Sequence, residues 1–348
     1  MPEGGHDPLP GSGQRDSDGE GLLEELDLIS LNPRLRAKLE RQSEQEKRLT
    51  REQRDSLIGL LPPGAVLFDE PMARHSSLGA GGSAEAYVRV EDTAELIRLL
   101  GWALENTVDY RFFGFGSATL VRDGGVSGLM VKLGSGFKAA DLERQQGDDV
   151  FVSAGAAFRS KDLANLCAAR GLTGAEPFGE FDGTVAGALF AKGGETTPAF
   201  APAIEEVTIV TKEGRELTLR GQALRFEEGA LKIPRTSAVA KILLKLKAAA
   251  DAKSHDETSV DDPDSQMRLA RIFASPCKTK ASVLIEEAGL CGVRVGGARV
   301  SNRDANSIVN EGQATARDVA VLMSLVRDRV KDETGITLMP LIDVIGER

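Results

Sequence analysis

From about residue 62 onwards, the hydrophobic pattern of this 348-residue chain switches repeatedly between a period of two and a period near 3.6. Residues 84–90 (AEAYVRV) alternate as a strand does, and an Asp-x-x-Glu capping signal from Asp92 to Glu95 follows at once. A helix carrying several leucines comes next. Because both periods recur along the chain, the sequence predicts an α+β fold.

Other segments repeat this alternation. The residue pattern predicts further strands at 110–113, 129–133 and 241–246, a hairpin of 207–211 with 216–219, and a helix at 160–170 before Gly171. The clearest late element is a helix that begins at a capping box, Thr315 to Asp318, and ends before Gly335.

Composition divides the chain into four parts. Residues 1–31 begin with Gly, Pro, Ser and Asp and few apolar residues, which predicts a disordered tail. Residues 32–61 are charged and favour a helix, either simply solvated or docked on a protein partner. A polar run before residue 267 predicts a boundary between a domain at 62–246, itself split near residue 135, and a C-terminal domain at 247–348.

The overall charge and the cysteines exclude several classes of protein. A net charge of −10 argues against a general nucleic-acid binder, since a polyanion would be repelled. Three cysteines without metal-type spacing predict neither a structural metal site nor a disulfide framework. No stretch reaches the ~20 apolar residues of a membrane span, and the N-terminus has no signal-peptide pattern, so a cytoplasmic location is expected.

Three glycine-rich blocks are candidate binding loops. They are residues 75–84 with Gly81 and Gly82, residues 113–128 with Gly114, Gly116 and Ser117, and residues 174–194 with Gly183, Thr184 and Gly187. Each block alone is equally typical of a tight turn between strands. Their order along the chain is the more specific signal.

Together with residues 283–310 and the closing Ile345-Gly346-Glu347, these blocks resemble the UDP-N-acetylenolpyruvoylglucosamine reductase family over residues 60–348. The resemblance implies an FAD-binding domain of two α/β subdomains, of the PCMH or vanillyl-alcohol-oxidase-like type, and a C-terminal α+β substrate domain. It also implies non-covalent FAD, NADPH as reductant, and a UDP-sugar of peptidoglycan precursor synthesis as ligand.

The resemblance assigns flavin contacts to the glycines, Ser117 and Thr184 of the three blocks, with the 113–128 block facing the diphosphate. Four positions depart from the family pattern: Ala118 replaces an asparagine, Glu180 a glycine, Asp182 a proline and Lys192 an asparagine. The two carboxylates oppose a bound diphosphate, and Lys192 offsets them in part.

The family's catalytic residues are a serine that protonates the substrate, and an arginine and a glutamate that hold its carboxylate. The serine motif Gly-Ser-x-Phe-Lys-Asn-Pro corresponds here to residues 270–276, which places Arg271 at the serine. A guanidinium stays charged and has no proton to give near neutral pH. The glutamate motif Pro-Glu-Val corresponds to residues 340–342, which places the apolar Leu341 at the glutamate. Asp343 is a substitute with shorter reach.

The family's Tyr-Arg-x-Ser phrase fits two registers, residues 226–229 (FEEG) or residues 234–237 (PRTS). The second is preferred because it keeps Arg235, the one catalytic candidate, although an ordinary surface arginine explains it equally well. Two functions follow. The first is a pseudoenzyme that acts as a binding or regulatory module, and the alternative is a divergent NADPH- and FAD-dependent reductase that uses water or Ser275 as proton donor.

Overall fold

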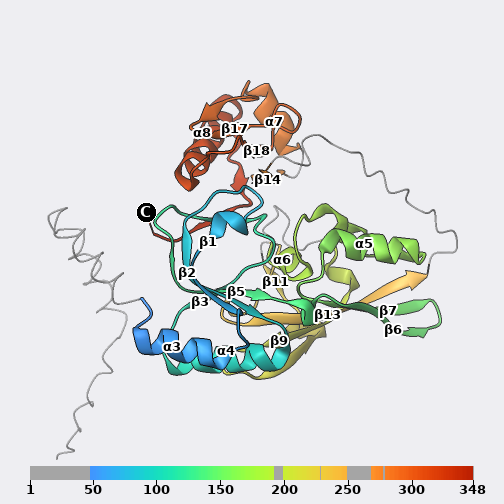
Figure 1. Ribbon diagram of the computed structural model, residues 1–348. Coiled ribbons are helices and arrows are strands. Elements are labelled where there is room, and N and C mark those ends of the chain that lie inside the picture. The colour runs from blue at the N-terminus through green and yellow to red at the C-terminus, as the bar shows by residue number, and fades with distance from the viewer. Residues whose placement is uncertain (1–47, 192–198, 228, 249–267, 277–278, 348) are drawn as a thin grey trace, which may run out of the picture. The chain divides into compact units, whose positions relative to one another are not determined.

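The computed structural model describes residues 48–191, 199–227, 229–248, 268–276 and 279–347 (Figure 1). The chain divides after Arg48, and the second unit, Leu49–Arg348, contains every element described below. The predicted tail, most of the charged extension, the polar run before residue 267 and Lys192 lie outside the described residues.

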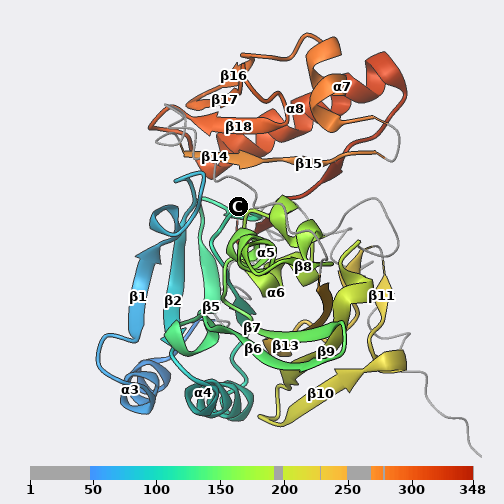
Figure 2. The ribbon, with the colours of Figure 1, turned by 90° about the vertical axis from the view of Figure 1, so that its right-hand side faces the viewer.

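The first sheet has the order β1-β2-β5-β3, with strands β1 (Val66–Pro71), β2 (Ser83–Val90), β5 (Val126–Leu133) and β3 (Tyr110–Phe112). Strand β1 is antiparallel to β2, whereas β2, β5 and β3 are parallel. Helix α4 (Thr93–Glu105) begins at the predicted cap, where the Glu95 N–H donates to Asp92 Oδ1 at 2.8 Å. Helices α3 (Arg51–Leu60) and α4 cover one face of this sheet (Figures 1 and 2).

Helix α3 shows where the predicted charged extension ends. Thr50 and Gln53 form a capping box at its start, and Leu57 is fully buried in the core beneath the first sheet. The buried carboxylate of Glu85 accepts hydrogen bonds from the N–H groups of Leu49 and Gly128. Residues 49–61 are therefore part of the compact unit and not a solvated arm, because a few apolar residues suffice to dock a short helix.

The second sheet is antiparallel, with the order β10-β9-β13-β7-β6 and β8 beside β13. Its strands are β6 (Ala140–Gln146), β7 (Asp149–Gly155), β8 (Leu172–Thr173), β9 (Ile204–Val210), β10 (Glu216–Arg220) and β13 (Ala238–Ala248). The predicted hairpin is confirmed as β9 and β10, and the predicted helix as α5 (Ser160–Ala169). Helix α6 (Val185–Leu189) and the strand pair β11 (Phe226–Glu227) and β12 (Ala230–Leu231) complete this part.

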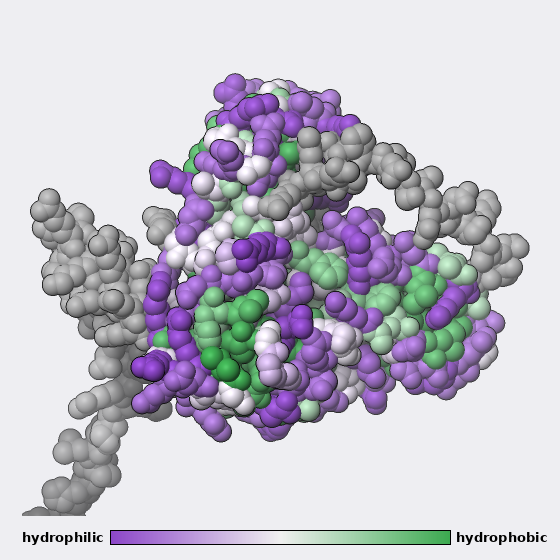
Figure 3. Space-filling model, in the orientation of Figure 1, coloured by the Kyte–Doolittle hydropathy of each residue, from purple (hydrophilic) through white to green (hydrophobic). Residues whose placement is uncertain are grey.

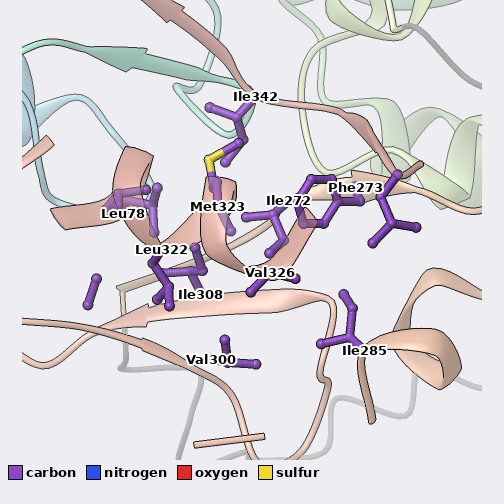
Figure 4. Close-up of a cluster of buried hydrophobic side chains, with 14 of the residues drawn as sticks. Leu78, Ile272, Phe273, Ile285, Val300, Ile308, Leu322, Met323, Val326 and Ile342 are labelled. Atoms are coloured by element: carbon purple, nitrogen blue, oxygen red, sulfur yellow. The ribbon is translucent and has the colours of Figure 1, made fainter. Parts of the chain in front are cut away.

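The C-terminal part combines a four-stranded sheet with two helices. Its elements are β14 (Arg268–Arg271), β18 (Ser307–Asn310), β17 (Ala298–Val300), β16 (Arg294–Val295), α7 (Ala281–Glu287) and α8 (Ala316–Thr334). Helix α8 begins at the predicted capping box and ends at Gly335, whose φ is 72°. Its apolar face packs on α7 and the sheet, and Leu78 from the first glycine block joins this core (Figure 4).

Two short strand pairs connect distant segments. Strand β15 (Phe273–Ala274) pairs with β19 (Met339–Pro340), and β20 (Asp343–Ile345) runs parallel to β4 (Thr119–Val121). The end of the chain thus returns to the segment that follows the second glycine block.

The surface and the cysteines agree with an ordinary globular unit. The face shown in Figure 3 is mostly hydrophilic, with separate hydrophobic areas. Among the described residues, no helix is long and apolar enough to cross a membrane, and no group of three or more His, Cys, Asp and Glu side chains could hold a metal. Cys167 is buried, which raises the pKa of its thiol to about 11 and is typical of a core residue.

Candidate cofactor and substrate site

The second glycine block leaves β3 and turns sharply against the first block. The backbone N–H and the hydroxyl of Ser77 both donate to the carbonyl oxygen of Gly116, at 3.2 and 3.1 Å. Gly116 has a φ of 71°, and a β-carbon on it would lie 2.3 Å from the His75 carbonyl oxygen. Only glycine fits this position, so the tight turn between residues 113 and 117 depends on it.

The third block, which belongs to the part of the chain that contains the second sheet, packs against the same turn. Thr184 is buried, and its Oγ1 accepts the Gly187 N–H at 3.0 Å at the start of α6. A β-carbon on Gly114 would lie 3.2 Å from that Oγ1, and one on Gly183 would lie 3.4 Å from Oγ of Ser117. The structure therefore brings together the predicted residues of the second and third blocks.

Gly81 and Gly82 allow two segments of the protein backbone to approach each other closely. Gly81 has a φ of 138°, and a β-carbon on Gly82 would lie 2.4 Å from the Arg122 carbonyl oxygen. The Gly82 N–H also donates to the Val121 carbonyl oxygen at 3.2 Å. These two glycines pack the first block against the chain that follows β4, so the backbone that approaches them is the protein's own.

The Asp182 carboxylate, predicted to oppose a diphosphate, has two cationic partners. Its Oδ1 lies 3.2 Å from Arg159 Nη2 and 3.5 Å from Lys161 Nζ. Both partners belong to the segment that pairs with the third block, since Arg159 forms an isolated β-bridge with Thr184. The local charge is therefore balanced without Lys192.

These loops fit FAD on geometric grounds. At Gly114 and Gly183 the backbone carries no side chain, and the converging loops present N–H groups and the partly buried Ser117 hydroxyl. Such an edge suits a diphosphate, which needs donors and a close approach of the backbone. The residues that would hold FAD are those the sequence predicts at Gly114, Gly116, Ser117, Gly183 and Thr184.

The positions matched to the family's serine and glutamate meet on two neighbouring strands. Arg271 ends β14 just before β15, and Leu341 directly follows β19, the partner of β15. The Leu341 N–H donates to the Ile272 carbonyl oxygen at 2.8 Å. The backbones at Arg271 and Leu341 thus lie on neighbouring strands. The Arg271 side chain is exposed and that of Leu341 is half-buried, and neither can give a proton near neutral pH.

Arg235 lies elsewhere. It is exposed in the turn before β13, where the Tyr110 hydroxyl donates to the Thr236 carbonyl oxygen at 2.6 Å. Tyr110 begins β3, whereas the second glycine block follows the opposite end of that strand. The structure does not bring Arg235 to the glycine turn, and its catalytic role stays a prediction.

The other register of the arginine motif is occupied by structural residues. Phe226 lies in β11 and stacks edge-on against Phe200, with ring centroids 6.3 Å apart. Glu227, at the arginine position in that register, forms an ion pair with Lys232 at 2.7 Å. Neither register therefore supplies a structurally supported arginine.

Sequence reasoning missed the residues that join the C-terminal part to the glycine blocks. Asp123 accepts the N–H groups of Ala316 and Arg317 at the start of α8, both at 2.9 Å. Asn310 is buried, and its Nδ2 donates to the Leu78 carbonyl oxygen at 2.8 Å. The capping box of α8 could be read from local spacing, whereas a cap contributed from nearly two hundred residues away leaves no local signal.

Two family models match the chain. The model described as FAD binding domain matches residues 84–220, and the model described as UDP-N-acetylenolpyruvoylglucosamine reductase, C-terminal domain, matches residues 262–345. Together with the converging glycine loops, these matches define an FAD-binding flavoprotein with a separate C-terminal domain. The predicted α+β fold with these two parts is confirmed.

Individual relatives agree over most of the chain. UDP-N-acetylenolpyruvoylglucosamine reductase 2 of Symbiobacterium thermophilum is 35% identical over 292 residues, which cover 82% of this chain and 93% of that protein. The reductase of Desulfosudis oleivorans is 31% identical over 298 residues, covering 81% and 95%. The crystal structure of the reductase MurB from Thermus caldophilus superposes with a TM-score of 0.62 at 28% identity, covering 80% and 97%. The chain belongs to the UDP-N-acetylenolpyruvoylglucosamine reductase family of peptidoglycan precursor synthesis.

Proposed function

We propose that this chain is an FAD-binding member of the reductase family that does not complete the reduction of an enolpyruvyl UDP-sugar, and that it acts as a binding or regulatory module. The observation that carries the proposal is the pair Arg271 and Leu341, which stand on neighbouring strands at the positions matched to the family's proton donor and carboxylate-polarising group. A pseudoenzyme of this kind keeps the family's fold and lacks the side chain that protonates the substrate.

The cofactor half of the reaction keeps its structural basis. The turn at residues 113–117 and the Thr184 cap would hold the FAD diphosphate, and bound FAD would supply hydride transfer, with NADPH as the reductant. Because a diphosphate at this turn would be bound mainly by backbone N–H groups, the substitutions Ala118 and Asp182 would leave most of this surface in place.

The positions matched to the family's substrate site carry a positive charge, but the family's proton donor is replaced. Arg271 presents an exposed guanidinium that can bind the carboxylate or diphosphate of a UDP-sugar. The neighbouring Ser275 Oγ accepts the Ala281 N–H at 3.2 Å at the start of α7, so this hydroxyl caps a helix. The Arg271 side chain therefore favours binding without proton delivery, whereas the Ser275 hydroxyl keeps a proton that the second candidate could use.

A divergent reductase is the second candidate, favoured by the position of Asp343. Its backbone N–H donates to the Ala118 carbonyl oxygen at 3.0 Å, and its side chain is exposed beside the second glycine block. A carboxylate there could polarise a substrate or orient a water molecule as proton donor. The likeness to reductases over four-fifths of the chain also supports this candidate.

Two measurements on the purified full chain separate the candidates. The visible spectrum after incubation with FAD and desalting reports cofactor binding, and we expect a retained flavin band. Anaerobic NADPH oxidation is then compared with and without UDP-N-acetylenolpyruvoylglucosamine. The pseudoenzyme predicts no increase on adding the sugar, whereas multiple turnovers would establish the divergent reductase instead.

A further inference from the structure

A lysine that the family resemblance does not single out lies against the candidate diphosphate turn. Lys132 is near the carboxyl end of β5, and its ammonium lies 5.6 Å from the ring centroid of Phe115. Phe115 stands between Gly114 and Gly116, the two glycines of the turn. Strands β5 and β3 are parallel neighbours, so Lys132 lies at the sheet edge from which the turn leaves. This is the edge at which ligands of parallel sheets bind.

The positive charge of Lys132 is not matched by a protein carboxylate. Within the described parts of the chain, neither Lys132 nor Lys138 forms an ion pair. The carboxylate of Glu91 is engaged by Arg89 at 2.6 Å and by Ser135. Burial lowers the pKa of Lys132, and repulsion from Lys138 adds to this effect.

A half-buried ammonium without a counter-charge destabilises the cofactor-free protein. An anionic ligand at the turn would remove that cost and gain a charge-assisted contact. The turn itself offers N–H groups and the Ser117 hydroxyl, since Ala118 has no side-chain donor, and the cations around Asp182 are already paired. Among the described residues, Lys132 is thus a positive charge without an ion pair that lies against Phe115 of the turn.

We propose that Lys132 provides the positive charge that holds the diphosphate of FAD at the Gly114–Gly116 turn, with Phe115 fixing the direction of its side chain. The inference rests on the FAD binding in the proposed function, and it names the side chain whose charge attracts the diphosphate. Lys138, exposed on the adjoining segment, adds to the local potential without direct contact.

The test measures FAD affinity of the full chain by quenching of flavin fluorescence at several salt concentrations. Lys132→Met keeps the length of the side chain and removes the charge, and we expect about 10–100-fold weaker FAD binding with a shallower salt dependence. Lys132→Arg retains a charge above Phe115 and should stay within about threefold of the wild type. Lys212→Met, an exposed lysine in the β9–β10 turn, makes the same change in net charge and should change neither quantity.

Thermal unfolding of the cofactor-free variants checks that each one folds. Unchanged affinity in Lys132→Met would overturn the inference while leaving FAD binding intact. Weaker binding with the salt dependence of the wild type, or an equal loss in Lys132→Arg, would show a packing role and would also overturn it. A wild-type chain that binds no FAD would contradict the proposed function itself, and the inference would fall with it.

Discussion

The cofactor loops and the β15–β19 region have diverged to different extents. Around Gly116 and Thr184, the turn is formed by bare glycine backbone and by hydrogen bonds from Ser77 and to Thr184 Oγ1, and the departures at Ala118 and Asp182 do not touch these contacts. At Arg271 and Leu341 the family's chemistry depends on individual side chains, so under the proposed function two substitutions would be enough to remove it. A binding surface built from many loop contacts can outlast a reaction that depends on a few side chains.

The two regions remain firmly joined. Asp123 caps α8, Asn310 binds the carbonyl oxygen of Leu78, and β20 pairs with β4. Leu78 itself lies in the core of the C-terminal part (Figure 4). The substitutions at Arg271 and Leu341 are therefore not accompanied by a loss of these connecting contacts, and restoring the family's side chains is a meaningful experiment.

The largest effect is expected from restoring the acid groups. The double substitution Arg271→Ser with Leu341→Glu returns the family's residues to their positions. Because general acid catalysis contributes about 10²–10⁴-fold, we expect sugar-dependent NADPH oxidation to rise by at least 10²-fold. Arg271→Ala with Leu341→Ala is the matched control and should show no gain. Equal rates in the restored and alanine variants would argue that further residues are missing.

The second largest effect is expected from a change in the cofactor turn, which should weaken FAD binding. Gly116→Val places a branched side chain at a φ of 71° against the His75 carbonyl oxygen. Backbone strain of about 1–3 kcal/mol, with steric overlap in addition, should weaken FAD binding about 10–100-fold or more. Fluorescence titration with FAD measures the loss.

The control is a glycine with free space around it. Gly101 lies within α4, and no atom lies within 4 Å of a β-carbon placed on it. Gly101→Ala should leave FAD affinity unchanged and raise the free energy of unfolding by up to about 1 kcal/mol. Unchanged FAD affinity in Gly116→Val would show that the cofactor does not use this turn.

A smaller effect, on the free energy of unfolding, is expected from the contacts that join the two regions. Asp123→Ala removes a cap from the Ala316 and Arg317 N–H groups, while the Thr315 cap remains. We expect a loss of about 1 kcal/mol in the free energy of unfolding, measured by urea denaturation. Asp148→Ala, in the β6–β7 turn, is a control of equal charge. A loss as small as the control's would mean that the cap is not a stabilising contact.

The smallest effect concerns pH. Hydrogen bonds from the Thr315 N–H hold the pKa of Asp318 below its ordinary value. A lowered folded pKa adds stability that is present above the unfolded value near 4 and is lost as pH falls through the folded pKa. Asp318→Asn should therefore cost a few tenths of a kcal/mol at neutral pH and progressively less in acid, as measured by thermal unfolding. A stability difference between wild type and Asp318→Asn that grows as the pH falls would contradict this prediction.

Local patterns predicted several helices and strands correctly, whereas contacts between residues far apart in the sequence could not be predicted from them. The α8 capping box and the hairpin of β9 and β10 depend on neighbouring residues and were predicted correctly. The charged composition of residues 32–61 gave no sign that Leu57 is buried, and only the first sheet's core shows why it is. Arg235 was chosen on a three-residue motif, which carries no information about which end of β3 it adjoins.

One measurement tests the central claim most directly. The FAD-loaded chain is reduced anaerobically with one equivalent of dithionite, so that NADPH is not needed, and UDP-N-acetylenolpyruvoylglucosamine is then added while flavin absorbance is followed. If the flavin site is kept and the acid is lost, the flavin stays reduced after the sugar is added. Prompt return of the oxidised flavin band would contradict the account and establish an active reductase.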